Sequence, residues 1–120
     1  MKISTGLLPK ALKRAVPVFV LILAGYYANA QFDGCNLNFD GDNPVVRYTT
    51  HRYTVTNFNP GYSYGQWVIF GCDEVDEGID ADGEPYIDVY IWGEDGALVT
   101  YGEAAPGWYQ YGEYDISLTP

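Results

Sequence analysis

Aromatic and acidic side chains recur in this sequence in a fixed order: two aromatics on alternate residues, then glycine, then an acid or amide. The order appears at 109–113 (YQYGE), 90–94 (YIWGE) and 62–66 (YSYGQ), and in weaker form at 99–103 (VTYGE). Aromatic rings stack on the C–H faces of sugars, and carboxylates accept hydrogen bonds from hydroxyls. Tyr and Trp are also common anchors of protein interfaces. The pattern therefore predicts a surface that binds a glycan or a partner protein.

The segment 86–92 (YIDVYIW) shows how such a surface would be presented. Side chains alternate between the faces of a strand, so the aliphatic residues Ile87, Val89 and Ile91 are expected in the core. The opposite face carries Tyr86, Asp88, Tyr90 and Trp92. A hairpin at Asp95-Gly96 is expected to keep this parity and bring Val99, Tyr101 and Glu103 alongside. The residues expected to bind a ligand are Tyr90, Trp92, Glu94, Tyr101, Tyr109, Tyr111 and Glu113.

A purely structural use of the same pattern is the alternative. Aromatic side chains commonly cover strand glycines, and cross-strand aromatic pairs stabilise sheets by themselves. Tyr109, Tyr111 and Glu113 share one parity, but the turn at Pro106-Gly107 decides whether they join the face of Tyr90. The pattern predicts a glycine-punctuated sheet in either case.

The segment 73–84 (DEVDEGIDADGE) holds seven acids and is expected to form an acidic loop. Oxygen-rich loops bind Ca²⁺, and Asp76, Asp80 and Asp82 are the ligands expected here. The register does not fit an EF-hand, however, and a second candidate at 36–42 would place Arg47 where the bidentate Glu belongs. Asx turns and solvated charge are the alternative. No other cofactor is expected.

Little in the sequence supports a catalytic site, and no catalytic residue is assigned. His51 is the single histidine, which rules out a site of two or three His ligands. Ser63 and Ser117 are the serines after residue 30, and neither lies in a G-x-S-x-G context. The chain is therefore expected not to be an enzyme, and Arg47 and Arg52 are expected to pair with nearby acids.

Residues 1–30 have the features of a signal peptide. Lys2, Lys10, Lys13 and Arg14 form a basic region, residues 15–24 are apolar, and Ala28-Asn29-Ala30 supplies a cleavage site. Secretion with cleavage after Ala30 would leave one domain, 31–120, with two basic residues against sixteen acids, a net charge of −14. Such a surface repels nucleic acid and anionic membranes, so a protein or glycan is the expected partner. Cys35 and Cys72 are expected to form a disulfide in an oxidising compartment.

The rest of the chain reads as short strands between turns, without helical periodicity. Strands are expected at 45–58, as one long strand or two bent pieces, and at 64–72, 86–92, 97–101 and 108–118. The apolar run 64–72 is expected in the middle of a sheet. This spacing predicts an all-β fold: a small antiparallel β-sandwich or partly closed barrel of six to seven strands.

In size, strand number and cysteine spacing the chain is similar to small secreted β-sandwich effectors of the MAX type and to small carbohydrate-binding modules. Many unrelated proteins share these features, so no family is assigned. The expected function is that of a secreted, non-catalytic recognition module binding a partner protein or a glycan. A carbohydrate-binding module acting on extracellular polysaccharide and a surface or filament subunit are the alternatives. The oligomeric state stays open.

Overall fold

The computed structural model describes residues 31–32, 36–61, 64–105 and 108–120, and these residues form eight strands and no helix. In chain order the strands are β1 (Gln31–Phe32), β2 (Phe39–Asp40), β3 (Thr50–Val55), β4 (Tyr64–Phe70), β5 (Cys72–Ile79), β6 (Pro85–Ile91), β7 (Ala97–Ala105) and β8 (Trp108–Ile116). The prediction of an all-β chain is confirmed. Within this described part, no helix is long and apolar enough to cross a membrane.

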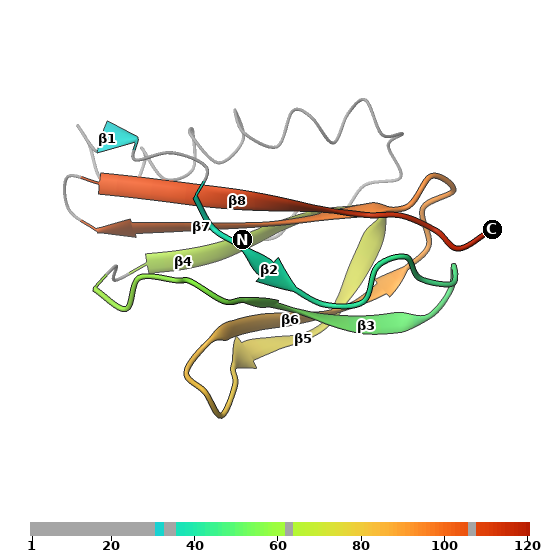
Figure 1. Cartoon of the computed structure of the whole chain (residues 1–120), viewed down its shortest axis with the longest axis horizontal. Coiled ribbons are helices and arrows are strands. Elements are labelled where there is room, and N and C mark those ends of the chain that lie inside the picture. Colours follow the sequence, from blue (N-terminus) through green and yellow to red (C-terminus); the bar gives the residue numbers. More distant parts are fainter. Residues whose placement is uncertain (1–30, 33–35, 62–63, 106–107) are drawn as a thin grey trace.

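The strands form two four-stranded sheets (Figure 1). The β7 sheet has the order β1-β8-β7-β4, and the β6 sheet has the order β2-β3-β6-β5. Neighbouring strands run antiparallel, except that the short β1 runs parallel to β8. Antiparallel neighbours of this length allow the polar-out, apolar-in alternation that the sequence shows in β6.

The hydrophobic core lies between the two sheets. Ile87, Val89 and Ile91 of β6 are fully buried, as the alternation in 86–92 predicts. Trp67 and Val99 of the β7 sheet belong to the same core cluster. The ring of Trp67 also meets Phe39 of β2 across the interface, with ring centroids 6.1 Å apart. Aliphatic side chains of β6 thus face aromatic side chains from the opposite sheet.

The expected hairpin between 86–92 and 97–101 is wrong, because β6 and β7 belong to different sheets. The chain crosses between the sheets at residues 92–96. The backbone N–H groups of Trp92 and Gly93 both donate to the carbonyl oxygen of Gly71, at 3.1 and 2.8 Å. A Cβ atom at Gly93 would lie 2.2 Å from the carbonyl oxygen of Gly96, so glycine permits this close crossing. Val99, Tyr101 and Glu103 therefore do not lie beside β6.

Three other expectations about elements are also wrong. The acidic segment is not a loop: residues 72–79 form β5, which pairs with β6, and a turn follows at 80–84. β5 is an edge strand whose side chains after Cys72 are exposed or half-buried, which lets the carboxylates separate. β4 lies at the edge of the β7 sheet instead of its middle. The strand expected at 45–58 is limited to Thr50–Val55.

The segment 1–30, where a signal peptide is expected, and Cys35 lie outside the described residues. Cys72 is fully buried where β5 begins. The disulfide and the cleavage after Ala30 stay predictions.

Candidate binding surface

The residues expected to bind a ligand occupy three separate places. Tyr90, Trp92 and Glu94 lie at the end of β6, with Tyr90 and Glu94 exposed and Trp92 half-buried. Tyr101 points into the core between the sheets. Tyr109 and Tyr111 are buried, and Glu113 half-buried, on the face of the β7 sheet that points away from the core. No single surface unites them, because β6 and β7 belong to different sheets.

An ion pair between neighbouring strands organises the solvent face of the β6 sheet. Arg52 of β3 stands opposite Asp88 of β6. Its Nε donates to Asp88 Oδ1 at 2.7 Å and its Nη2 to Oδ2 at 2.9 Å, a bidentate geometry. These hydrogen bonds raise the pKa of Arg52 above its ordinary value. The expectation that Arg52 pairs with an acid is confirmed.

The same guanidinium group lies over an aromatic ring. Arg52 Cζ is 3.8 Å from the centroid of Tyr86, a cation–π distance. The Tyr86 hydroxyl donates to Asp76 Oδ2 of β5 at 2.9 Å, and this bond raises the pKa of Tyr86. Side chains of β3, β6 and β5 are thus linked in one row across the sheet.

Two further tyrosines extend this face beyond the ion pair. Tyr48 is 56 % exposed, and its ring centroid lies 6.5 Å from that of Tyr90, which is 37 % exposed. Tyr48 has a positive φ of 69°, and its backbone N–H donates to the carbonyl oxygen of Ile91. This anchor holds the Tyr48 ring beside the end of β6. We call the surface formed by Tyr48, Arg52, Tyr86, Asp88 and Tyr90 the tyrosine face.

Arg47 also contacts this surface, through groups other than a carboxylate. Its Nε donates to the carbonyl oxygen of Trp92 at 2.9 Å, and its Cζ lies 4.5 Å from the centroid of Tyr48. Its contacts on this face are therefore a backbone carbonyl and a ring, where the sequence predicts an acid. Both arginines of the described residues cover tyrosine rings.

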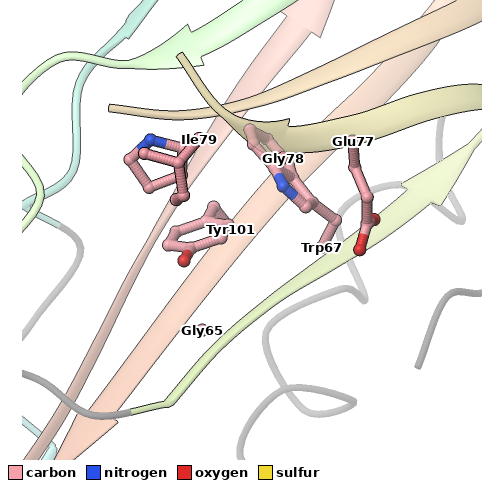
Figure 2. Close-up of a pocket in the computed structure, with 7 residues that line it drawn as sticks. Gly65, Trp67, Glu77, Gly78, Ile79 and Tyr101 are labelled. Carbon is pink, nitrogen blue, oxygen red and sulfur yellow. The ribbon is translucent and has the colours of Figure 1, made fainter. Parts of the chain in front are cut away.

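A cleft of about 170 Å³ opens between the edge strands β4 and β5 of the two sheets (Figure 2). Its walls include the rings of Trp67 and Tyr101, whose centroids are 4.8 Å apart at a tilt of 59°. Both rings are at least nine-tenths buried and belong to the core cluster, so they offer little free surface to a ligand. Ligand sites usually enclose roughly 300–1,000 Å³. The cleft fits one small group.

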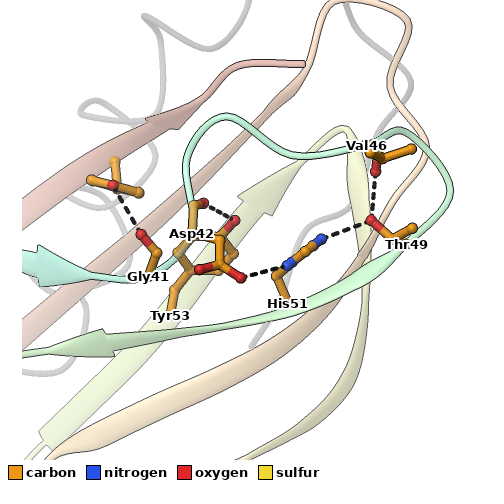
Figure 3. A network of polar contacts seen from close by, with 7 residues as sticks. Gly41, Asp42, Val46, Thr49, His51 and Tyr53 are labelled. Atoms are coloured by element: carbon orange, nitrogen blue, oxygen red, sulfur yellow. Dashed lines mark hydrogen bonds and ion pairs between the residues drawn. The ribbon is translucent and has the colours of Figure 1, made fainter. Parts of the chain in front are cut away.

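His51 bridges Asp42 and Thr49 in a row that outwardly matches a catalytic triad (Figure 3). His51 Nδ1 lies 3.1 Å from Asp42 Oδ2, and Nε2 lies 2.7 Å from Thr49 Oγ1. The Thr49 hydroxyl, however, donates its proton to the carbonyl oxygen of Val46. It must therefore accept a hydrogen bond from Nε2, whereas a nucleophile would give its proton to that nitrogen. The row fastens the 42–49 segment to β3 and offers no activated hydroxyl.

The residues expected to bind calcium are only partly brought together. Ligand atoms of Asp80, Asp82 and Glu84 lie within 4.8 Å of one another. Asp80 Oδ1 already accepts the backbone N–H groups of Asp82 and Glu84, both at 2.9 Å, which closes the turn. Asp76 instead accepts the Tyr86 hydroxyl on the tyrosine face. The Asp80 carboxylate therefore closes the turn between β5 and β6.

Of the tyrosine face, the sequence names only Tyr90 as a ligand-binding residue. It places Tyr86 and Asp88 on the same strand face, predicts Arg52 only as the partner of an acid, and gives no signal for Tyr48. Arg52 and Asp88 are 36 residues apart, and only the register of β3 against β6 makes them neighbours. Tyr48 lies in the turn before β3, and no periodicity signals a positive φ there.

Comparisons of the chain with protein-family models, with curated proteins and with solved structures find no match.

Proposed function

We propose that this chain is a secreted, non-catalytic recognition module that binds a partner protein through the tyrosine face. The observation that carries the proposal is the exposed Tyr48–Tyr90 pair next to the Arg52–Asp88 ion pair on paired strands. Tyrosine and arginine are enriched among the residues that dominate binding energy in protein interfaces. β3 and β6 hold Arg52 and Tyr90, and a backbone hydrogen bond to Ile91 holds Tyr48, in fixed positions, which lowers the entropic cost of binding.

The ring geometry favours a protein over a glycan. A sugar platform needs an uncovered ring face, but guanidinium groups cover one face of Tyr86 and one of Tyr48. The Tyr48 and Tyr90 rings are tilted by 34° and do not form one plane. Such a surface suits irregular side chains of a partner better than a flat pyranose ring. Binding of an extracellular polysaccharide is the second candidate.

The charge of the chain points to a basic partner. Asp73 and Asp76 border the tyrosine face, and the sequence after residue 30 has a net charge of −14. A negative potential speeds association with a positively charged surface and is screened by salt. We therefore include a basic surface on the partner in the proposal.

A filament subunit that grows by strand pairing is less well supported. β5 is an edge strand, but Asp73, Glu74, Asp76 and Glu77 make it acidic. Its register also shifts between Glu74 and Asp76, as at a β-bulge. Acidic side chains and bulges on an edge are features that oppose edge-to-edge pairing.

The proposal includes the finer features of fold and export that the sequence predicts. We propose a β-sandwich, because one core cluster draws residues from both sheets. We also retain the Cys35–Cys72 disulfide and cleavage after Ala30. The basic, apolar and small-residue regions of 1–30 support export, and export supports the disulfide.

The test compares captures from the extracellular fluid of the source with three immobilised chains: wild type, Tyr90→Ser and Val75→Ser. Val75 is 61 % exposed on β5 and serves as the matched control. A protein that wild type and Val75→Ser retain, that Tyr90→Ser loses, and that salt releases would support the proposal. Retention on insoluble polysaccharide that depends on Tyr90 would favour the glycan candidate. If no retention depended on Tyr90, the tyrosine face would not be the binding surface.

A further inference from the structure

The cleft between β4 and β5 has an acid and an exposed aliphatic side chain on one of its walls. Glu77 of β5 stands opposite Ile87 of β6, and Ile79 stands opposite Pro85. Paired residues of neighbouring strands point to the same side of a sheet, and Ile87 is buried in the core. Glu77 and Ile79 therefore project from β5 toward the β7 sheet, and both are exposed where they line the cleft.

The shape of the cleft sets the size of its ligand. Gly65 and Gly78 line it without side chains, and a Cβ atom at Gly65 would collide with the Tyr101 hydroxyl. In the view of Figure 2, the rings of Trp67 and Tyr101 lie between Ile79 and Glu77. An apolar cavity of about 150 Å³ accepts one benzene molecule. The cleft, at about 170 Å³, therefore accommodates one amino-acid side chain.

The charge around the cleft favours a cation. Residues 73–77 of β5 include four acids. The two arginines of the described residues make their contacts on the tyrosine face, Arg52 with Asp88 and Arg47 with the carbonyl oxygen of Trp92. Clefts that are lined by one sign of charge concentrate ligands of the opposite sign. The acid and the apolar wall together match a cation on an aliphatic stem.

We propose that this cleft binds a lysine side chain of a partner protein. The ammonium group donates to the Glu77 carboxylate, whose two oxygens can accept several hydrogen bonds, and the stem lies against Ile79. Glu77 and Ile79 are two residues apart in β5, roughly 7 Å, which a four-carbon stem and its ammonium group bridge. Arginine fits less well, because its planar group stacks on ring faces, and the rings of Trp67 and Tyr101 are buried in the core cluster.

This inference rests on the proposed function for the source of the lysine, a partner with a basic surface. Asp76 borders the tyrosine face, and Glu77, the next residue, faces the cleft. One partner can therefore contact the tyrosine face and place a lysine around the edge strand into the cleft.

The test needs no partner, because butylammonium carries the stem and the charge of lysine. Nuclear magnetic resonance spectra of the whole protein are recorded during titration with butylammonium, with butanol as the uncharged control and sodium chloride as the control for ionic strength. We expect the Trp67 indole N–H and the Gly78 amide to shift saturably with butylammonium, and butanol to bind about fivefold more weakly. Equal shifts with sodium chloride, or no saturable shift at these two groups, would overturn the proposal.

A pair of variants separates the cleft from net charge. Glu77→Gln should weaken butylammonium binding about fivefold. Asp95→Asn removes the same charge from an exposed position at the crossing between the sheets and should leave binding unchanged. Equal losses in the two variants would overturn the proposal, and tighter binding of propylguanidinium would overturn the choice of lysine. Intact butylammonium binding without capture through Tyr90 would refute the proposed function alone, and the reverse result would refute only the lysine site.

Discussion

Replacing Gly112 by Ala tests the structural meaning of the repeated aromatic-glycine-acid pattern. Gly112 lies in β8, within YQYGE, on the side that faces the core. A Cβ atom there would lie 2.4 Å from the carbonyl oxygen of Leu37, 2.7 Å from the Leu37 Cβ and 2.9 Å from the Phe39 ring. The segment leading into β2 therefore runs directly over this glycine, and a methyl group has no room.

The geometry sets the size of the effect. The nearest obstacle is a backbone oxygen, which cannot rotate away, so β8 and the 37–39 segment must move apart. Overpacking of this kind costs about 1–3 kcal/mol. Phe39 also packs on Trp67 and Tyr114, so the shift disturbs those ring pairs and puts the expected cost near 3 kcal/mol. For a domain of this size, each 1 kcal/mol lowers Tm by roughly 4–8 °C.

Thermal unfolding followed by tryptophan fluorescence measures the loss, with Gly78→Ala as the matched control. Gly78 is also a strand glycine, but its Cβ would meet only the Tyr86 ring at 3.2 Å, and that ring lies on an open face. We expect Gly78→Ala to shift Tm by a few degrees and Gly112→Ala by more than about 10 °C. Similar Tm values for the two variants would show that the close approach at Gly112 does not constrain the fold.

Three further predictions concern polar groups. Burial raises the pKa of Glu103, despite hydrogen bonds from Gln110 and the Asn59 backbone, so the folded state holds its proton more tightly than the unfolded state. The free energy of unfolding should therefore fall as pH rises from about 4, and urea titrations of Glu103→Gln should show a smaller fall. Tyr53→Phe should cost about 1 kcal/mol in urea unfolding, because the hydroxyl of this buried ring donates to the Asp42 carbonyl at 2.6 Å. Asp80→Ala should cost a similar amount through its two backbone bonds; a rise in Tm of several degrees with Ca²⁺, absent from the variant, would instead show ion binding.

Local alternation in the sequence predicted strands better than it predicted their neighbours. Ile87, Val89 and Ile91 are buried as a period of two requires. The pairing of β7 with β4 and β8 depends on the crossing at Gly71, Gly93 and Gly96, which a two-residue hairpin signal does not reveal. β5 shows the same limit of local pattern. Its run of acids predicted a loop, but an edge strand also keeps these carboxylates apart in solvent.

The candidate site shows the same division. Tyr90 and Trp92 share a parity, and the structure leaves Tyr90 exposed and Trp92 half-buried. Tyr101 and Tyr111 carry the same local pattern, yet Tyr101 packs on Trp67 in the core and Tyr111 lies on the side of the β7 sheet that points away from the core. Position in a sheet, and not the local motif, decides whether an aromatic is core or surface.

The both-sided burial of β4 links fold to function. An edge strand with Trp67 and Ile69 on one side and Val68 and Phe70 on the other is apolar on both parities. An apolar run on both parities therefore does not prove a central strand: β4 is at a sheet edge, and the β6 sheet packs against only one of its two sides. The solvent face of the β6 sheet needs no apolar cover, because the Arg52–Asp88 pair and Tyr86 satisfy one another there, so the two sheets are suited to different kinds of contact.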